Sequence, residues 1–130
     1  MNLLTTEVLL CEKLPVELKN NNTGRGHAHW QSTKQRKLYE QQLRTSGFIR
    51  KPFDETVDLV VCRILGKRQR LWDADSVLRG SAKELIDSLV ACGWFHDDGA
   101  KWIRNCVGIQ DDSRKHEGPA VVVTVMSIER

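Results

Sequence analysis

The run from Val57 to Leu65 (VDLVVCRIL) is apolar and β-branched at most of its positions. A strand in the middle of a sheet has such a composition, because it packs against other side chains on both of its faces. We therefore expect this run to form a central strand. A chain built around such a strand must also supply helices or further strands to cover it.

Two segments carry the signals of helices that pack on a sheet. Residues 82–92 place apolar side chains on one face at helical spacing. Residues 33–46 have a thinner apolar stripe, formed by Leu38, Tyr39 and Leu43, and a basic back. A glycine follows each segment, as is common after a helix. Ser32 and Ser81 precede the segments, each followed three residues later by Gln or Glu. This capping-box pattern predicts where both helices begin.

Three further strands are expected from β-branched and apolar runs, over residues 6–14, 101–109 and 120–128. The polar segment 110–119 most simply joins the last two strands as an antiparallel hairpin. The predicted order is β-α-β-α-β-β, which gives an α/β fold with a small mixed sheet and two main helices packed on it. At 130 residues, the chain is expected to form a single domain, residues 1–130.

Charge is distributed unevenly along the chain. Residues 1–70 contain 13 Lys and Arg against 7 Asp and Glu, a net charge of +6, whereas residues 71–130 contain 7 against 10, a net charge of −3. A basic half can follow a phosphate backbone and an acidic half can hold a metal, although a solvated mixed surface has the same composition.

Other features of the sequence indicate a cytoplasmic protein. No apolar run is long enough to cross a membrane, and the first residues lack the pattern of a secretion signal. The four cysteines are widely separated and form no C-x-x-C motif. They are therefore expected to be reduced, buried thiols.

Aspartates cluster in two short segments. Asp73 and Asp75 are two residues apart, so on an extended backbone both carboxylates point to the same side. Asp97 and Asp98 lie in the turn that leads into the strand after the second helix. If that strand pairs near the one that ends at Leu65, the two acidic segments converge. Carboxylate oxygens suit Mg²⁺ or Mn²⁺ rather than zinc. The alternative is a pair of solvated acidic turns.

Lys83 lies in the first turn of the second predicted helix, close in sequence to the aspartates. An amine held at a fixed point can neutralise the charge that develops on an attacked phosphate. The alternative is a surface pair with Asp87 four residues later, which stabilises a helix by only about 0.2–0.5 kcal/mol. Trp72, next to Asp73, can equally pack in the core or stack on an unpaired base.

In combination, these motifs resemble one known family. The stretch Asp73-Ala-Asp75, then Lys83-Glu-Leu-Ile-Asp87, then Gly93-Trp-Phe-His-Asp97-Asp98 is similar to the RusA family of Holliday junction resolvases. That family has D-x-D-N, a lysine and an aspartate on a helix, and a glycine-aromatic segment that ends in D-D.

The resemblance implies a Mg²⁺-dependent homodimer, bacterial or phage-encoded, that cuts four-way DNA junctions by paired symmetrical incisions; Mn²⁺ is a possible substitute. Carried over by position, Asp73, Asp75 and Asp98 are expected to be metal ligands, and Lys83 the catalytic lysine, with Asp97 as a supporting neighbour. The residues expected to contact DNA phosphates are Arg25, Lys34, Arg36, Lys37, Lys67, Arg68 and Arg70.

Two departures from the family pattern motivate a second hypothesis. Ser76 follows the second aspartate where the family has asparagine, and the interval from Asp75 to Lys83 is four residues longer. The added residues form either a loop before the helix or an extra helical turn of about 5.4 Å. The second hypothesis is a DNA-binding or assembly protein on the same fold with a weakened active site. A third is a metal-dependent nuclease with another nucleic-acid substrate.

Overall fold

The computed structural model describes residues 7–19, 29–73 and 76–128. In chain order, its elements are β1 (Val8–Leu14), α1 (His29–Thr45), β2 (Val57–Ile64), α2 (Ser76–Arg79), α3 (Ala82–Ala91), β3 (Ile103–Asp111), a short 3-10 turn (Lys115–Glu117) and β4 (Ala120–Ser127). The predicted α/β class is confirmed. The order of strands and main helices is also as expected, with α2 as an addition.

The described strands form one sheet in the order β1-β4-β2-β3. β2 pairs in parallel with β3 and antiparallel with β4, so the predicted central strand is confirmed. The predicted hairpin between the last two strands is wrong, because β2 lies between them. β2 is buried along most of its length. The connection from β3 to β4 crosses the end of β2, so that β2 has a hydrogen-bonded strand on each edge.

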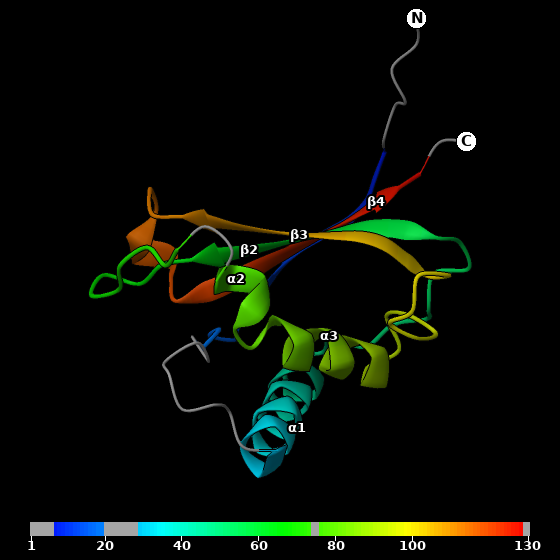
Figure 1. The fold of residues 1–130 in the computed structure, drawn as a ribbon, viewed down its shortest axis with the longest axis horizontal. Helices are drawn as coiled ribbons and strands as arrows, with labels where there is room; N and C mark the ends of the chain where they lie inside the picture. The colour runs from blue at the N-terminus through cyan, green and yellow to red at the C-terminus, as the bar shows by residue number, and fades with distance from the viewer. Residues whose placement is uncertain (1–6, 20–28, 74–75, 129–130) are drawn as a thin grey trace, which may run out of the picture.

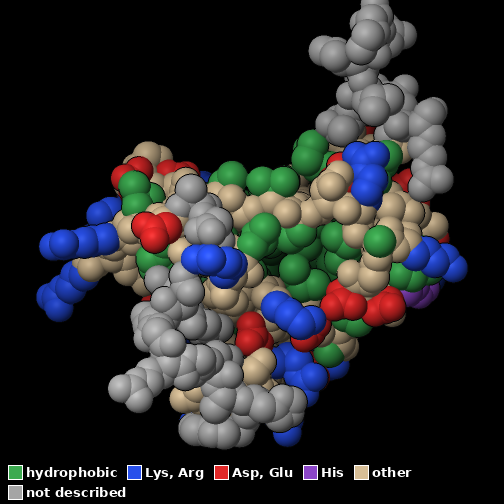
Figure 2. Space-filling view, viewed as in Figure 1, with side chains coloured by type: hydrophobic (Ala, Val, Ile, Leu, Met, Phe, Trp, Pro, Cys, Tyr) green, Lys and Arg blue, Asp and Glu red, His purple; other side chains and the backbone are tan. Residues whose placement is uncertain are grey.

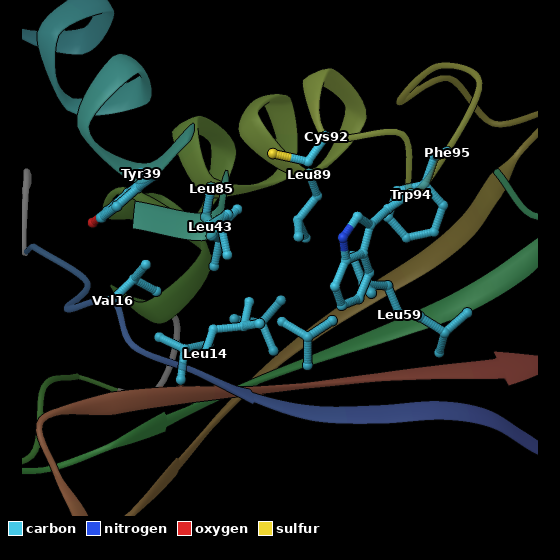
Figure 3. Packing of buried hydrophobic residues seen from close by; sticks show 14 of the residues in the cluster. Leu14, Val16, Tyr39, Leu43, Leu59, Leu85, Leu89, Cys92, Trp94 and Phe95 are labelled. Atoms are coloured by element: carbon cyan, nitrogen blue, oxygen red, sulfur yellow. The ribbon is translucent and has the colours of Figure 1, made fainter. Parts of the chain in front are cut away.

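The helices of the described residues all lie on one side of the sheet (Figure 1). Figure 3 shows the resulting core, in which Tyr39 and Leu43 of α1 and Leu85 and Leu89 of α3 point toward the strands. Each of these side chains is at most 1% exposed. Leu38, which the sequence placed on the same stripe of α1, is 46% exposed instead. The buried stripe of α1 is therefore narrower than predicted.

Both main helices end where the sequence predicts. Gly47 and Gly93 adopt φ angles of +81° and +89°, a left-handed conformation that favours glycine after a helix. The Gly93 turn then leads into Trp94, which is buried and donates a hydrogen bond from its indole nitrogen to the Phe48 carbonyl oxygen at 2.8 Å. The chain that follows α3 is thus fixed in the core before it reaches the acidic pair Asp97-Asp98.

The predicted capping boxes are wrong, although α3 does begin at the expected residue. α1 starts at His29, so Ser32 lies inside the helix, where its hydroxyl donates to Glu84 of α3 at 2.7 Å. Ser81 makes no side-chain cap bond, and its hydroxyl oxygen accepts from the Lys19 backbone N–H at 2.7 Å. Both serines connect different segments rather than closing the end of their own helix.

None of the helices in the described ranges combines the length and apolar character needed to span a bilayer.

Candidate active site

Charged side chains from two separate segments meet at the start of α3. The Lys83 Nζ lies 3.6 Å from Asp98 Oδ2 and 3.8 Å from Asp87 Oδ1. Asp87 is one turn further along α3, whereas Asp98 comes from the turn that precedes β3. The predicted pair of Lys83 and Asp87 therefore exists, but the fold adds Asp98 to it. The lysine side chain remains 73% exposed and is accessible from solvent.

The geometry of this cluster follows from buried anchors on both sides. Tyr39 and Ser81 share a hydrogen bond of 2.7 Å that ties the start of α3 to α1. On the other side, buried Phe95 precedes the acidic turn. Within the turn, the Asp98 backbone N–H donates to Asp97 Oδ1 at 2.7 Å. Asp97 thus supports the backbone of Asp98.

The neighbouring charges of the cluster affect the pKa of Asp87. Burial raises the pKa of this carboxyl above its ordinary value, and the nearby charge of Asp98 raises it as well, while Lys83 and Arg36 oppose the rise. Arg36 belongs to α1 and is one of the residues expected to contact DNA. Its charge acts on the acidic cluster from the neighbouring helix.

A pocket of about 330 Å³ opens beside the cluster. Figure 2 shows a hollow between β3 and α3 with a hydrophobic surface and charged side chains around it. Its apolar lining comes from Leu78, Ile86, Ile103 and Cys106, and its charged lining from Lys83, Asp98 and Arg104. Burial raises the pKa of the Cys106 thiol to about 11, so this cysteine is a neutral part of the wall.

A second set of contacts fixes the chain immediately before Asp73. The side-chain amide of Gln110 accepts from the Trp72 backbone N–H at 2.9 Å and donates to the Trp72 carbonyl oxygen at 3.0 Å. Arg63 donates to the same amide oxygen at 2.8 Å and to the Arg70 carbonyl oxygen at 3.1 Å. We call Arg63, Trp72 and Gln110 the loop clamp.

The loop clamp also shows how Trp72 packs, which the sequence left open between the core and an unpaired base. The Arg63 guanidinium carbon lies 3.7 Å from the centre of the indole ring. Arg63 itself is 3% exposed, and burial lowers its pKa. A buried guanidinium is costly unless its donors are satisfied, and here oxygen acceptors and the indole face provide the compensation. Trp72 packs on an arginine, as the core alternative for this residue expects.

Asp73 follows the clamp and is exposed, at the carboxyl end of β3. Asp98 precedes the amino end of the same strand. β3 runs parallel to β2, so Asp98 lies at the end of the sheet where both strands begin, whereas Asp73 lies at the end where both strands finish. The pairing of β3 with β2 therefore does not bring Asp98 to Asp73. Ile103 and Gln110 are separated by about 23 Å at the usual rise of a strand.

α2 carries the chain back along β3 between these two points. Gly108 of β3 permits this, because a Cβ there would lie 2.9 Å from Val77 Cβ and 3.0 Å from Leu78 Cγ. The added residues thus form a separate short helix, followed by Gly80 and then by α3. The added residues are therefore neither the loop nor the extension of the following helix that the sequence analysis considered.

Asp75 lies outside the described residues, so its position relative to the cluster stays a prediction. Across residues 7–19, 29–73 and 76–128, no three His, Cys, Asp or Glu side chains are grouped so that they could hold a metal ion. Asp73 and Asp98 lie near opposite ends of β3, so the described part of the chain does not bring these two predicted ligands to one ion.

The expected DNA contacts fall on two surfaces. Lys34, Arg36 and Lys37 are exposed on α1, and Lys67, Arg68 and Arg70 are exposed in the loop after β2. Arg25 lies outside the described residues.

The loop after β2 is held in place at Gln69. Its amide oxygen accepts from the Gly66 N–H at 2.7 Å, and its amide nitrogen donates to Glu17 at 2.9 Å. Lys115 donates to its carbonyl oxygen at 3.0 Å. The basic side chains of this loop therefore project from a fixed backbone.

The sequence names Asp87 both as a surface partner of Lys83 and as part of the RusA-like motif, because its spacing places it on the same helix face. Sequence reasoning assigned no role to Arg63 and Gln110 of the loop clamp. Arg63 and Gln110 carry no local signal at all, since their partners lie up to 47 residues away. No protein-family model matches this chain, and no curated protein is significantly similar to it.

Proposed function

We propose that this chain is a divalent-cation-dependent endonuclease that acts on branched DNA, of the RusA type, and that it works as a homodimer. One observation carries the proposal. Lys83 Nζ lies within 4 Å of the carboxylates of both Asp87 and Asp98, which belong to separate segments of the RusA-like motif. Motif residues that sequence alone places far apart thus share one exposed site.

The donor chemistry around Lys83 fits Mg²⁺ or Mn²⁺. The carboxylate oxygens of Asp87 and Asp98 converge on one cationic group, and hard oxygen donors of this type are those that both ions prefer. In the proposal, Asp98 and Asp87 offer oxygen donors to an ion beside Lys83. Asp73 and Asp75 remain expected ligands, but Asp73 lies near the opposite end of β3 and does not share an ion with Asp98 of the same chain. A bound divalent ion supplies an activated water and neutralises phosphate charge.

The chain's own residues have separable roles in the proposed reaction. Lys83 is oriented by two carboxylates and open to solvent, so its ammonium group can neutralise the negative charge that grows on the attacked phosphate. Asp97 keeps the backbone of Asp98 in position through its hydrogen bond. The loop clamp determines the direction in which the chain enters Asp73.

The basic surfaces supply binding rather than chemistry. Lys67, Arg68 and Arg70 project from a tethered loop next to the clamp, and Lys34 and Lys37 add positive charge on α1. Contacts of this kind to phosphates are independent of sequence and weaken as salt increases. Binding to a four-way junction is therefore expected to be strongly salt-dependent.

The alternative function has its own support in the fold. Ser76, at the place of the family's asparagine, is 2% exposed and begins α2. A buried serine cannot offer its side chain to a ligand in solution as an exposed asparagine can. The inserted α2 also separates the D-x-D motif from Lys83. A DNA-binding or assembly protein with a weakened site on this fold is thus the second candidate.

One experiment separates the candidates. The full chain is incubated with a labelled four-way junction or a linear duplex of the same sequence, in Mg²⁺ or in Mn²⁺, and both binding and cleavage are measured. The variants are Asp75→Asn, Asp98→Asn and Lys83→Met. Asp112→Asn, which changes an exposed aspartate outside both clusters, is the matched control.

We expect paired cuts in the junction that depend on the metal ion and disappear in the three variants, with binding and the control unchanged. Junction binding with no metal-dependent cleavage by the unaltered chain would favour the alternative. Equal cleavage of the linear duplex and the junction would indicate a nuclease with a different substrate.

A further inference from the structure

The loop after β2 carries positive charge that no other side chain neutralises in the described part of the chain. Lys67, Arg68 and Arg70 are exposed, and none of them forms an ion pair with a described residue. By contrast, Lys13 pairs with Glu117 at 3.3 Å, and other exposed cations have carboxylate partners as well. Lys and Arg side chains project from this end of the sheet in Figure 2. Unpaired cations this close together attract a ligand with several negative charges.

An exposed leucine stands beside these cations. Leu71 is 56% exposed, the highest value among the large hydrophobic side chains of the described residues. A single exposed leucine is common on protein surfaces, but this one lines a pocket of about 330 Å³ together with Leu18 and Trp72. The leucine therefore continues an apolar wall that begins next to Arg70. We call Lys67, Arg68, Arg70 and Leu71 the basic tip.

Polar groups complete the lining of this pocket. Glu17 accepts a hydrogen bond from the Gln69 amide nitrogen at 2.9 Å, and the Lys19 Nζ lies 3.4 Å from the same carboxylate oxygen. Ligand pockets are typically apolar clefts with a few polar groups that fix orientation, and their volumes begin at about 300 Å³. This pocket therefore suits one flat ring system with hydrogen-bonding edges rather than a long chain.

The backbone of the basic tip is fixed on both sides of Leu71. Arg63 donates to the Arg70 carbonyl oxygen at 3.1 Å, and Gln110 holds both backbone groups of Trp72 at 2.9 and 3.0 Å. A side chain on a fixed backbone loses less conformational entropy when it contacts a ligand than one on a mobile loop does. The loop clamp therefore presents Leu71 to a ligand in a defined position.

A nucleotide has the chemistry that this arrangement recognises. It carries a phosphate and, one sugar away, a base with flat apolar faces and polar edges. Lys and Arg bind phosphates independently of sequence, and apolar or aromatic side chains bind the faces of bases that have lost their neighbours in the stack. In a regular duplex, stacking covers both faces of each base. Only an unpaired, unstacked base can therefore enter the pocket.

An anionic membrane is the other kind of partner that positive charge and an exposed leucine attract. Two carboxylates make the membrane the weaker candidate. Glu17 lines the pocket, and Asp73 is exposed two residues after Leu71. Both groups would approach negatively charged lipid if the basic tip inserted into a bilayer. A nucleic acid can leave them at its side.

We infer that the basic tip and its pocket bind one unpaired nucleotide, with phosphates on the three cations and the base against Leu71. The ligand class follows from the charges and the pocket, whereas its place at a DNA branch point rests on the proposed function. Leu71 thereby becomes a residue that distinguishes open DNA from regular duplex. The pocket lies at the end of β3 opposite the Lys83 cluster, so this contact can be altered without touching that cluster.

The test measures equilibrium binding of the full chain by fluorescence anisotropy, in EDTA so that no cleavage occurs. The three labelled DNAs have the same number of phosphates: a linear duplex, that duplex with a short mismatched bubble, and the bubble with abasic sites in place of its bases. The variants are Leu71→Ser and Arg68→Gln, each checked for folding by circular dichroism. Ile49→Ser is the matched control, because this side chain is 52% exposed on another surface.

We expect the unaltered chain to bind the bubble about tenfold more tightly than the duplex or the abasic bubble. Leu71→Ser should remove this preference, and Ile49→Ser should keep it. Arg68→Gln should weaken binding to all three DNAs by the same factor and lower the salt dependence by about one phosphate contact.

Equal affinity for the bubble and the abasic bubble, or a folded Leu71→Ser variant that keeps the preference, would overturn the inference. Tighter binding to vesicles of phosphatidylserine and phosphatidylcholine than to any of the DNAs would also overturn it, in favour of a membrane surface. Cleavage of a four-way junction in Mg²⁺ is measured separately with the same proteins. Cleavage without a preference for the bubble would reject the inference and keep the function, whereas a preference that depends on Leu71 without cleavage would reject the function and keep the inference.

Discussion

The side chain of Gln110 pairs with the backbone of Trp72 as a neighbouring strand would, with hydrogen bonds of 2.9 and 3.0 Å in the two directions. A single amide therefore extends the edge of the sheet to a loop that has no partner strand. Arg63 strengthens this pairing, because it donates a hydrogen bond to the same Gln110 amide oxygen and stacks on the indole ring of Trp72. The residue that follows this pairing is Asp73.

Replacement of Gln110 by Leu is expected to destabilise the protein by about 1–3 kcal/mol, because buried donors and an acceptor lose their partners. It should also weaken junction cleavage by raising the metal concentration required, since the chain entering Asp73 is no longer fixed. Urea denaturation and a Mn²⁺ titration of cleavage measure the two effects. Gln41→Leu, on the exposed side of α1, should change neither. A Gln110→Leu variant with full stability would show that the pairing contributes nothing.

Replacement of Lys83 by Met should separate catalysis from stability. Its two ion pairs are exposed, so the free energy of unfolding is expected to change by no more than about 1 kcal/mol. Loss of a charge that stabilises the transition state typically lowers kcat by about 10² to 10³. Single-turnover cleavage and urea denaturation are the measurements, with Lys51→Met as an exposed control. Unchanged cleavage by the Lys83 variant would remove the lysine from the mechanism.

Asp58 is expected to make the stability of the sheet depend on pH. Hydrogen bonds from Arg104 are the main cause that lowers the pKa of Asp58 below its ordinary value. A carboxyl with a lowered pKa in the folded state stabilises above its unfolded pKa of about 3.9, and this contribution is lost as the pH falls through the folded value. Asp58→Asn should therefore be less stable than the unaltered chain at pH 7.

The difference between these two proteins should shrink as the pH is lowered toward about 3. Denaturation curves at a series of pH values measure it. Asp112→Asn, at an exposed position, should show no such trend. A difference that stays constant between pH 7 and 3 would mean that the ion pair is not the cause.

Replacement of Gly108 by Ala should push α2 away from β3. The added Cβ would lie about 3 Å from both Val77 and Leu78, and overpacking of this kind typically costs about 1–3 kcal/mol. The displacement should also lower cleavage, because α2 connects the D-x-D motif to Lys83. Thermal unfolding and junction cleavage test this, with Gly99→Ala as a control whose nearest neighbour is the carboxylate of Asp97 at 3.5 Å. Wild-type stability in Gly108→Ala would show that α2 moves freely.

Local patterns in the sequence predicted the elements well and their connections less well. The run at Val57 has the composition of a buried strand, and glycines ended both main helices where a left-handed turn was needed. The capping boxes failed because Ser32 and Glu84, the serine of one box and the glutamate of the other, bond to each other across two helices. A pattern within four residues cannot reveal that a more distant partner competes for the same group.

The acidic motif shows the same division. The spacing of Lys83 and Asp87 determines that they share a helix face, and the residue types determine that carboxylates and an amine occur together. The Gly93 turn and the buried Trp94 bring Asp98 to that lysine. The parallel pairing of β2 and β3 places Asp98 at the end of the sheet opposite to the loop that follows β2. The position of Asp98 therefore depends on the packing of segments that are distant in the sequence into one core.

By itself, the sequence determined which segments form helices and strands, where the helices stop, and which residues could take part in metal-dependent chemistry. These properties arise from backbone preferences and from the periodicity of apolar side chains, which act over a few residues. The tertiary structure decided the order of the strands, the meeting of Lys83 with Asp98, and the loop clamp. Each of these depends on contacts between residues that are remote in the chain, and such contacts form only when the whole core packs.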